Sequence, residues 1–161
     1  MTSNFHFLAA EWPEVLEPAT KAEGLAYSDP RAACFYIRRA LELAVAWLYK
    51  HDASLRLPYQ DSLNALIHEP SFRQSVGSAV FTKAKLIKDL GNYAVHSHKP
   101  VRQYAALCSV KEFFHVAYWL AHTYGRGAKP DAGLSFNPEA LAKSVTVPQQ
   151  TLSVCLGTVT D

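Results

Sequence analysis

Four residues in the second half of the chain could act together on a phosphate group. Lys85, Lys88, Asn92 and His96 are spaced so that a continuous helix places them on one face. A lysine ammonium can hold a phosphate, an amide can orient it, and an imidazole can move a proton near neutral pH. Gly91 would let another backbone or a ligand approach closely. The spacing indicates either a phosphate-handling site or a solvated helix face on which Asn92 only ends the helix.

The segment after His96 adds positive charge beside this stripe. His98, Lys99 and Arg102 follow it closely in the sequence, and clustered cations attract phosphate-bearing partners. The same residues could instead only decorate a loop before the next helix. Arg39, from an earlier helix, would contribute a guanidinium if that helix packs against this segment. We therefore predict a nucleic-acid-binding set that comprises Arg39, Lys85, Lys88, His98, Lys99 and Arg102.

Other chemistries have weaker support. His96 and His98 form a His-x-His pair, with His115 and His122 on the following helix. A structural zinc needs four converging ligands, and the cysteines do not have zinc-ligand spacing, so we predict no metal and no cofactor. We find neither a Gly-x-x-x-x-Gly-Lys-Ser/Thr phosphate loop nor an acidic nuclease constellation. ATP hydrolysis and DNA cleavage are therefore not predicted for this chain.

Helices must position these residues. Asp29 followed by Pro30 supplies an N-cap carboxylate and a proline at the first helical position. The broad apolar stripe that follows predicts a long, buried helix that ends near His51. Before it, residues 5–26 predict a short helical turn and then a helix that Pro18 bends. After it, Asp61 is expected to cap a short helix that runs through Ile67.

Two more helices complete the prediction. The sequence Ser71-Phe72-Arg73-Gln74 has the form of a capping box that opens a helix through Leu90. Beyond Pro100, a heptad-like apolar seam predicts a last helix that ends near Tyr124. One face of this helix carries a set that is either a binding surface or a partly buried edge: Glu112, His115, Trp119 and His122.

The sequence therefore predicts an all-α fold, a bundle of four to five helices over residues 1–124. From Gly125, glycine and proline interrupt regular structure, and residues 125–161 are expected to form a linker and an irregular tail.

Composition limits the class of protein. With 161 residues, 49% hydrophobic and 19% charged, the chain suits one globular core. A net charge of +2 does not by itself indicate a nucleic-acid binder. Three widely spaced cysteines favour a reducing compartment, and we find neither a signal-peptide pattern nor a bilayer-spanning apolar run. We expect a cytoplasmic protein with no membrane association.

Two segments carry a resemblance to a known family. Arg39-Ala40-Leu41-Glu42, in a buried helix, paired with Leu90-Gly91-Asn92-Tyr93-Ala94-Val95-His96, after a later helix, resembles a HEPN-like domain family of undetermined function. That family occurs alone and at the N-terminus of type I restriction enzyme R subunits and related helicases. The resemblance covers about residues 5–127. It implies a HEPN-like homodimeric bundle that serves a restriction-modification or related defence system by binding RNA or DNA or by docking a system subunit.

The resemblance also implies an alternative activity. Active HEPN ribonucleases pair an arginine with a histidine a short distance later, and two such pairs meet across a homodimer in a metal-independent site. His96 matches that histidine, whereas positions 89–91 hold no arginine and Lys88 is the nearest cation. Lysine lacks the planar fork that grips phosphate at two points. The alternative is therefore a ribonuclease whose catalytic residues are His96, Lys88 and Asn92, with Lys88 or Arg39 steadying the phosphate.

Overall fold

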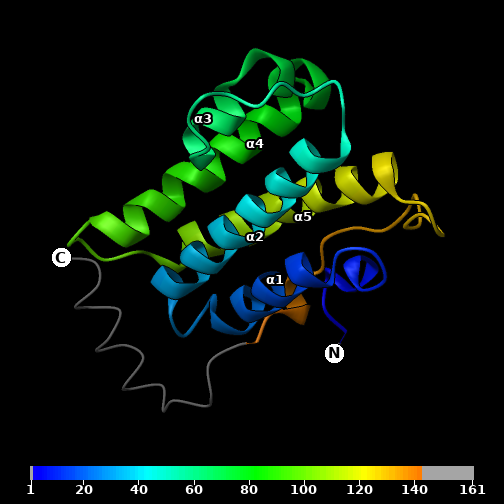
Figure 1. Cartoon of the computed structure of the whole chain (residues 1–161). Helices are drawn as coiled ribbons and strands as arrows, with labels where there is room; N and C mark the ends of the chain where they lie inside the picture. Colours follow the sequence, from blue (N-terminus) through cyan, green and yellow to red (C-terminus); the bar gives the residue numbers. More distant parts are fainter. Residues whose placement is uncertain (1, 143–161) are drawn as a thin grey trace, which may run out of the picture.

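All regular structure in residues 2–142, the part of the chain that a computed structural model describes, is helical (Figure 1). The all-α prediction is therefore confirmed. The predicted tail from residue 144 onward lies outside the described residues. The elements are, in order, a 3-10 turn η1 (His6–Leu8), α1 (Pro13–Leu25), α2 (Pro30–His51), α3 (Leu63–His68), α4 (Pro70–His96), α5 (Gln103–Tyr124) and a 3-10 turn η2 (Pro138–Ala140).

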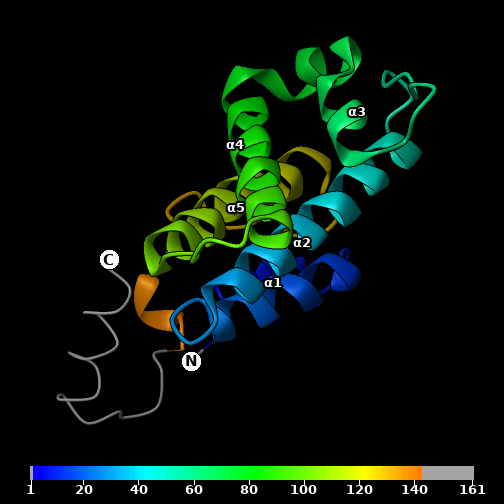
Figure 2. The ribbon, with the colours of Figure 1, turned by 90° about the vertical axis from the view of Figure 1, so that its left-hand side faces the viewer.

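The long helix α2 is the centre of the bundle. It begins as predicted, because the Asp29 side chain accepts a hydrogen bond from the Ala32 amide at 3.1 Å and Pro30 starts the helix. Helix α2 packs against α1, α4 and α5, and Figure 2 shows it running between α1 on one side and α4 on the other. Its apolar stripe is buried on these several sides, which explains why it is too broad for a surface helix.

The two caps predicted around α3 were wrong by one or two residues. Ser62, not Asp61, caps α3, since its hydroxyl accepts from the Ala65 amide at 3.2 Å. Helix α4 begins after Glu69, whose carboxylate accepts from the Ser71 amide at 2.7 Å. Proline at position 70 suits the first helical position, where no amide hydrogen is needed. The helix therefore starts before the predicted capping box.

Helix α4 contains a break that the sequence did not predict. Gly77 has φ 86° and ψ 166°, so the segments before and after it are two helices joined at a kink. This backbone conformation is open almost only to glycine. The first segment changes direction at the kink and lies beside α3, with Phe72 and Val76 still in the core, while residues 78–96 continue along α2 (Figures 1 and 2).

The chain after Tyr124 returns to α1. Asn137 and Asn4 exchange two hydrogen bonds, at 2.7 and 3.0 Å, and Leu141 is buried in the core. The described part of the predicted linker is mostly exposed and is held on the bundle at Asn137 and Leu141. The predicted boundary at residue 124 stays a prediction.

We predict that Gly77→Ala will lower the free energy of unfolding by about 1–3 kcal/mol, because alanine strains a φ of 86°. Gly24→Ala is the matched control. Gly24 lies within α1 with nothing near its added Cβ, so this change should raise the free energy by about 0.5–1 kcal/mol. Urea unfolding measures both. Equal stability of Gly77→Ala and the wild type would contradict the kink.

Candidate functional site

The C-terminal end of α4 is fastened by Arg31, from the first turn of α2. Its guanidinium donates hydrogen bonds to the carbonyl oxygens of Ala94, of Ser97 at 3.0 Å and of Lys99 at 2.5 Å. The last carbonyls of a helix have no partner within the helix, and a cation there offsets the negative end of the helix dipole. Arg31 therefore fixes the path by which residues 97–99 leave α4.

Helices α2 and α4 approach closely at Gly91. A Cβ atom at this position would lie 2.5 to 2.9 Å from the Cδ, Cβ and Cγ atoms of Arg38, which is too close for any side chain. The aliphatic part of Arg38 thus crosses α4 where glycine leaves room. Beyond it, Arg38 Nη1 lies 3.0 Å from Glu42 Oε1 in an ion pair. Gly91 therefore allows a close approach, as the sequence suggested, but the group that approaches is the Arg38 side chain and not a ligand.

The second helix does pack against this segment, but Arg38 rather than Arg39 makes the contact. The Arg39 side chain is 54% exposed and lies 3.5 Å from Glu42 Oε2. Arg39 is therefore on the solvent side of α2, within reach of a ligand. Its role in binding nucleic acid stays a prediction.

Lys88 is not a free cation. It is buried, and its ammonium donates to Asn64 Oδ1 at 2.8 Å and lies 3.0 Å from Asp89 Oδ1. Asn64 belongs to α3, so Lys88 connects α3 to α4. Because two partners already engage its ammonium, Lys88 has less capacity for phosphate than its place in the stripe suggested. Its predicted catalytic role stays untested.

The other predicted residues remain accessible. Lys85 and His96 on α4, and His98, Lys99 and Arg102 in the segment after it, are exposed, and Asn92 is half-buried. Within residues 2–142 none of these side chains has a hydrogen bond or an ion pair. From Lys85 to His96 the stripe is about 17 Å long, at 1.5 Å per residue. The structure thus leaves an open line of cations and imidazoles along α4 and the segment after it, and the exposed carboxylate of Asp89 lies on the same face between Lys85 and His96.

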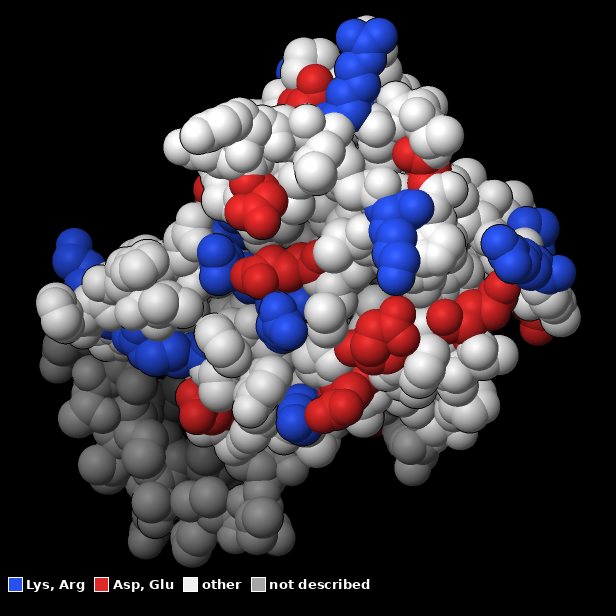
Figure 3. All heavy atoms as spheres, viewed as in Figure 1, with Lys and Arg blue, Asp and Glu red and all other residues white. Residues whose placement is uncertain are grey.

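Charge elsewhere is mixed. On the face shown in Figure 3, acidic and basic side chains alternate without a broad area of one sign. Glu42 pairs with both Arg38 and Arg39, which removes part of the positive charge of α2. Any attraction for phosphate is therefore local.

The predicted face of α5 does not form one surface, because Glu112 and His115 lie in one environment and Trp119 in another. Glu112 lies 2.5 Å from Lys83 Nζ and 3.6 Å from His115 Nδ1. Burial alone would raise the pKa of the Glu112 carboxyl, but the hydrogen bonds and charges of Lys83 and His115 together lower the pKa. Trp119 instead packs edge-on against Tyr124, in a separate aromatic cluster. These contacts favour the interpretation as a partly buried edge.

Glu112 and His115 also line a hollow of about 670 Å³ together with Cys108. Burial, and then the nearby charge of Glu112, raise the pKa of the Cys108 thiol. Because the thiolate is the nucleophilic form, the hollow lacks an activated cysteine. Among residues 2–142, no group of three or more His, Cys, Asp and Glu side chains could hold a metal ion. Nor is any helix within that range both long and apolar enough to span a bilayer.

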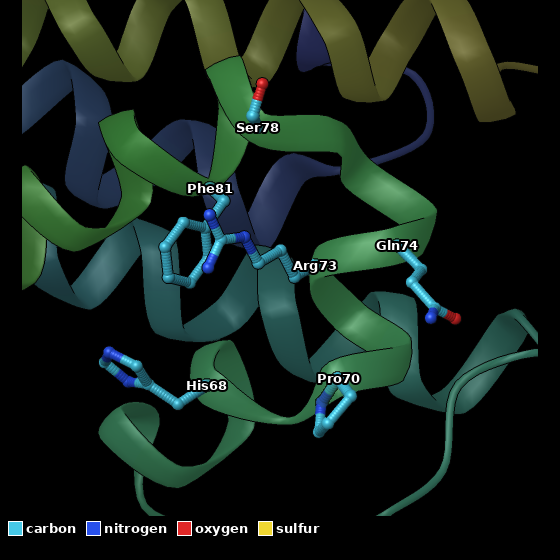
Figure 4. A pocket seen from close by; sticks show the side chains of 6 residues that line it. All are labelled: His68, Pro70, Arg73, Gln74, Ser78 and Phe81. Atoms are coloured by element: carbon cyan, nitrogen blue, oxygen red, sulfur yellow. The ribbon is translucent and has the colours of Figure 1, made fainter.

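A second hollow, of about 460 Å³, lies at the kink of α4 (Figure 4). The Arg73 guanidinium carbon lies 4.6 Å from the centre of the Phe81 ring. His68, from the end of α3, approaches the same ring edge-on, with ring centres 5.6 Å apart and planes at 89°. Sequence reasoning missed this group because it depends on the Gly77 kink. It also missed Arg31 and Asn64, whose partners are distant in the sequence.

The fold and site define a small helical module with an open, cation-bearing helix end. The chain belongs to the family described as a domain of unknown function, DUF4145, whose family model matches residues 20–132. The matched range contains Arg31, Gly91 and His96 and all of α2 to α5. The comparisons with curated proteins and with solved structures gave no match.

Replacing Arg31 by methionine should lower the free energy of unfolding by about 1.5–3 kcal/mol, because three carbonyl oxygens lose a charged donor. Arg39→Met, on the same helix, removes only a half-exposed ion pair and should change stability by less than about 1 kcal/mol. Urea unfolding compares the two, and amide exchange should accelerate at residues 97–99 in Arg31→Met alone. Equal losses in both variants would show that Arg31 does not fasten the end of α4.

Proposed function

We propose that this chain is an accessory helical module of a restriction-modification or related defence system that binds nucleic acid, RNA or DNA, or docks another subunit of that system. It has no ATPase or DNA-cleaving activity of its own. The observation that carries the proposal is the open line of Lys85, His96, His98, Lys99 and Arg102, whose side chains have no partners within the described residues.

The rigidity of the segment after α4 supports this proposal. Arg31 bonds to the backbone of Ser97 and Lys99 and so holds the segment in place without using its side chains. Cations that are already positioned lose less conformational entropy when a ligand binds. Phosphate groups are recognised by such fixed sets of lysine, arginine and backbone donors.

The spatial proximity of the two segments that resemble the HEPN-like family also supports the proposed function. They are far apart in the sequence, yet Arg38, directly before the first segment, lies against Gly91 of the second. Neighbouring placement of both segments fits a shared site. The proposed homodimer has support in exposed apolar side chains on α4, since Leu86 is 37% and Tyr93 is 42% exposed at a spacing of two turns.

Binding is tested by fluorescence anisotropy with labelled RNA and DNA at low salt. We expect affinity that falls steeply as salt rises, because bound phosphates release counterions. The triple variant Lys85→Ala, Lys99→Ala, Arg102→Ala should reduce the slope of log affinity against log salt by about three, or roughly one per phosphate contact.

A charge-matched triple variant is the control for this experiment. Lys21→Ala, Lys50→Ala and Arg126→Ala remove three exposed cations from other parts of the bundle and should leave most of the slope intact. If both triple variants weaken binding equally, the line at the end of α4 is not the binding surface. If the wild type binds neither polymer, only the subunit-docking form of the proposal survives.

A ribonuclease is the second candidate function, and one observation favours it. His96 is exposed and has no partner in residues 2–142. A residue that transfers a proton to or from RNA must be accessible in this way. In this candidate, His96 acts on the ribose hydroxyl or the leaving oxygen, while Lys88 or Arg39 steadies the phosphate. Lys88 would first have to share its ammonium with Asn64 and Asp89.

Incubation of RNA in EDTA tests this candidate. The wild type should cleave RNA, His96→Ala should cleave about 100-fold more slowly or worse, and the control His6→Ala, at an exposed histidine of η1, should retain most activity. Equal survival of the RNA in all samples contradicts a ribonuclease.

A further inference from the structure

The hollow at the kink of α4 lies outside every residue that the proposed function uses. It is lined by residues from the end of α3 and from both sides of Gly77 (Figure 4): His68, Pro70, Arg73, Gln74, Ser78 and Phe81. Five of these six side chains are exposed, and only Phe81 is buried. The hollow is therefore an open depression, lined by both polar and apolar groups, with the Phe81 ring beneath it.

Arg73 has one face covered and one face free. Its guanidinium lies over the Phe81 ring at 4.6 Å in a cation–π contact, and Figure 4 shows it in front of the ring. Within the described residues, the guanidinium has no hydrogen bond or ion pair. A planar guanidinium held in this way offers its outer face for stacking, and nucleobases stack on such planes.

The rim of the hollow can address the edge of a stacked ring. The Nδ1 atom of His68 lies 2.8 Å from the Asn64 carbonyl oxygen, so the imidazole is held in one orientation and its Nε2 atom is free. Gln74 and Ser78 border the hollow from the two sides of the kink, and Figure 4 shows both side chains pointing away from Arg73 and Phe81. The free Nε2 atom of His68 is therefore the rim group available to the hydrogen-bonding edge of a base.

The position of Phe81 connects the hollow to the cation line. Phe81 lies one helical turn before Lys85, at the i,i+4 spacing that places both on one face of α4. From Phe81 to His96 the face is about 22 Å long, at 1.5 Å per residue. A strand bound along this face can thus place a base in the hollow while its phosphates lie near Lys85.

We propose that Arg73 and Phe81 form a stacking site for one unpaired nucleobase of a nucleic-acid strand, and that this site makes the protein prefer single strands to duplexes. This inference rests on the nucleic-acid-binding form of the proposed function. A base paired within a duplex is already stacked on its neighbours and cannot enter the hollow.

Anisotropy with a single strand and a duplex of the same sequence tests the inference. The wild type should bind the single strand roughly tenfold more tightly, a preference in the range that one stacked base supplies. Arg73→Lys keeps the charge and loses the planar face, so it should lose most of this preference while its affinity for the duplex stays unchanged. Arg126→Lys, an exposed arginine on the loop after α5, is the matched control and should behave as the wild type.

A strand that carries 2-aminopurine at successive positions supplies a second measurement. One position should lose fluorescence on binding to the wild type and regain it with Arg73→Lys, whose fold is checked by circular dichroism. If the protein binds single strands and duplexes but Arg73→Lys does not change the preference between them, the inference is overturned. The proposed function then still stands. If the wild type binds neither single strands nor duplexes, both this inference and the nucleic-acid-binding form of the proposed function are overturned, and only the subunit-docking form survives.

Discussion

The close contact between α2 and α4 at Gly91 decides how the rest of this bundle is arranged. Because position 91 has no Cβ, the side chain of Arg38 can lie across α4, and the two helices approach within a distance that alanine would prevent. Gly91 and Ala94 are both buried, and the helical repeat turns Asn92 and His96 toward the other side of α4. The exposure of the candidate site therefore follows from a packing constraint.

The Gly77 kink has the opposite effect on the other half of α4. It gives residues 70–76 a different direction, so that Phe72 stacks on Tyr49 near the end of α2. It also lets α3 cover part of α4, where Asn64 accepts a hydrogen bond from Lys88. Lys88 is thus buried beneath α3, whereas Lys85 on the same helix stays accessible. The two lysines looked equivalent in the sequence, and only the position of α3 distinguishes them.

The helices could be predicted because their signals are local. Asp29 and Pro30 start α2, and apolar spacing defines its buried stripe and that of α5. The caps near α3 were misplaced because Asp61, Ser62 and Ser71 are all capping residues, and sequence does not decide among neighbours. The roles of Arg31 and Arg38 could not be predicted, since each depends on a helix more than 50 residues away. The family is now known, while the activity of His96 remains a hypothesis.

The buried carboxylate of Glu23 has a consequence for how this unit can be joined to other polypeptides. Glu23 accepts hydrogen bonds from the backbone and side-chain nitrogens of Asn4, at 2.9 and 3.0 Å, and its carbonyl oxygen accepts one from Ala142. Both ends of the described chain therefore meet at one point on α1. A fold with adjacent entry and exit points can be inserted into a surface loop of a host protein without separating the ends of that loop.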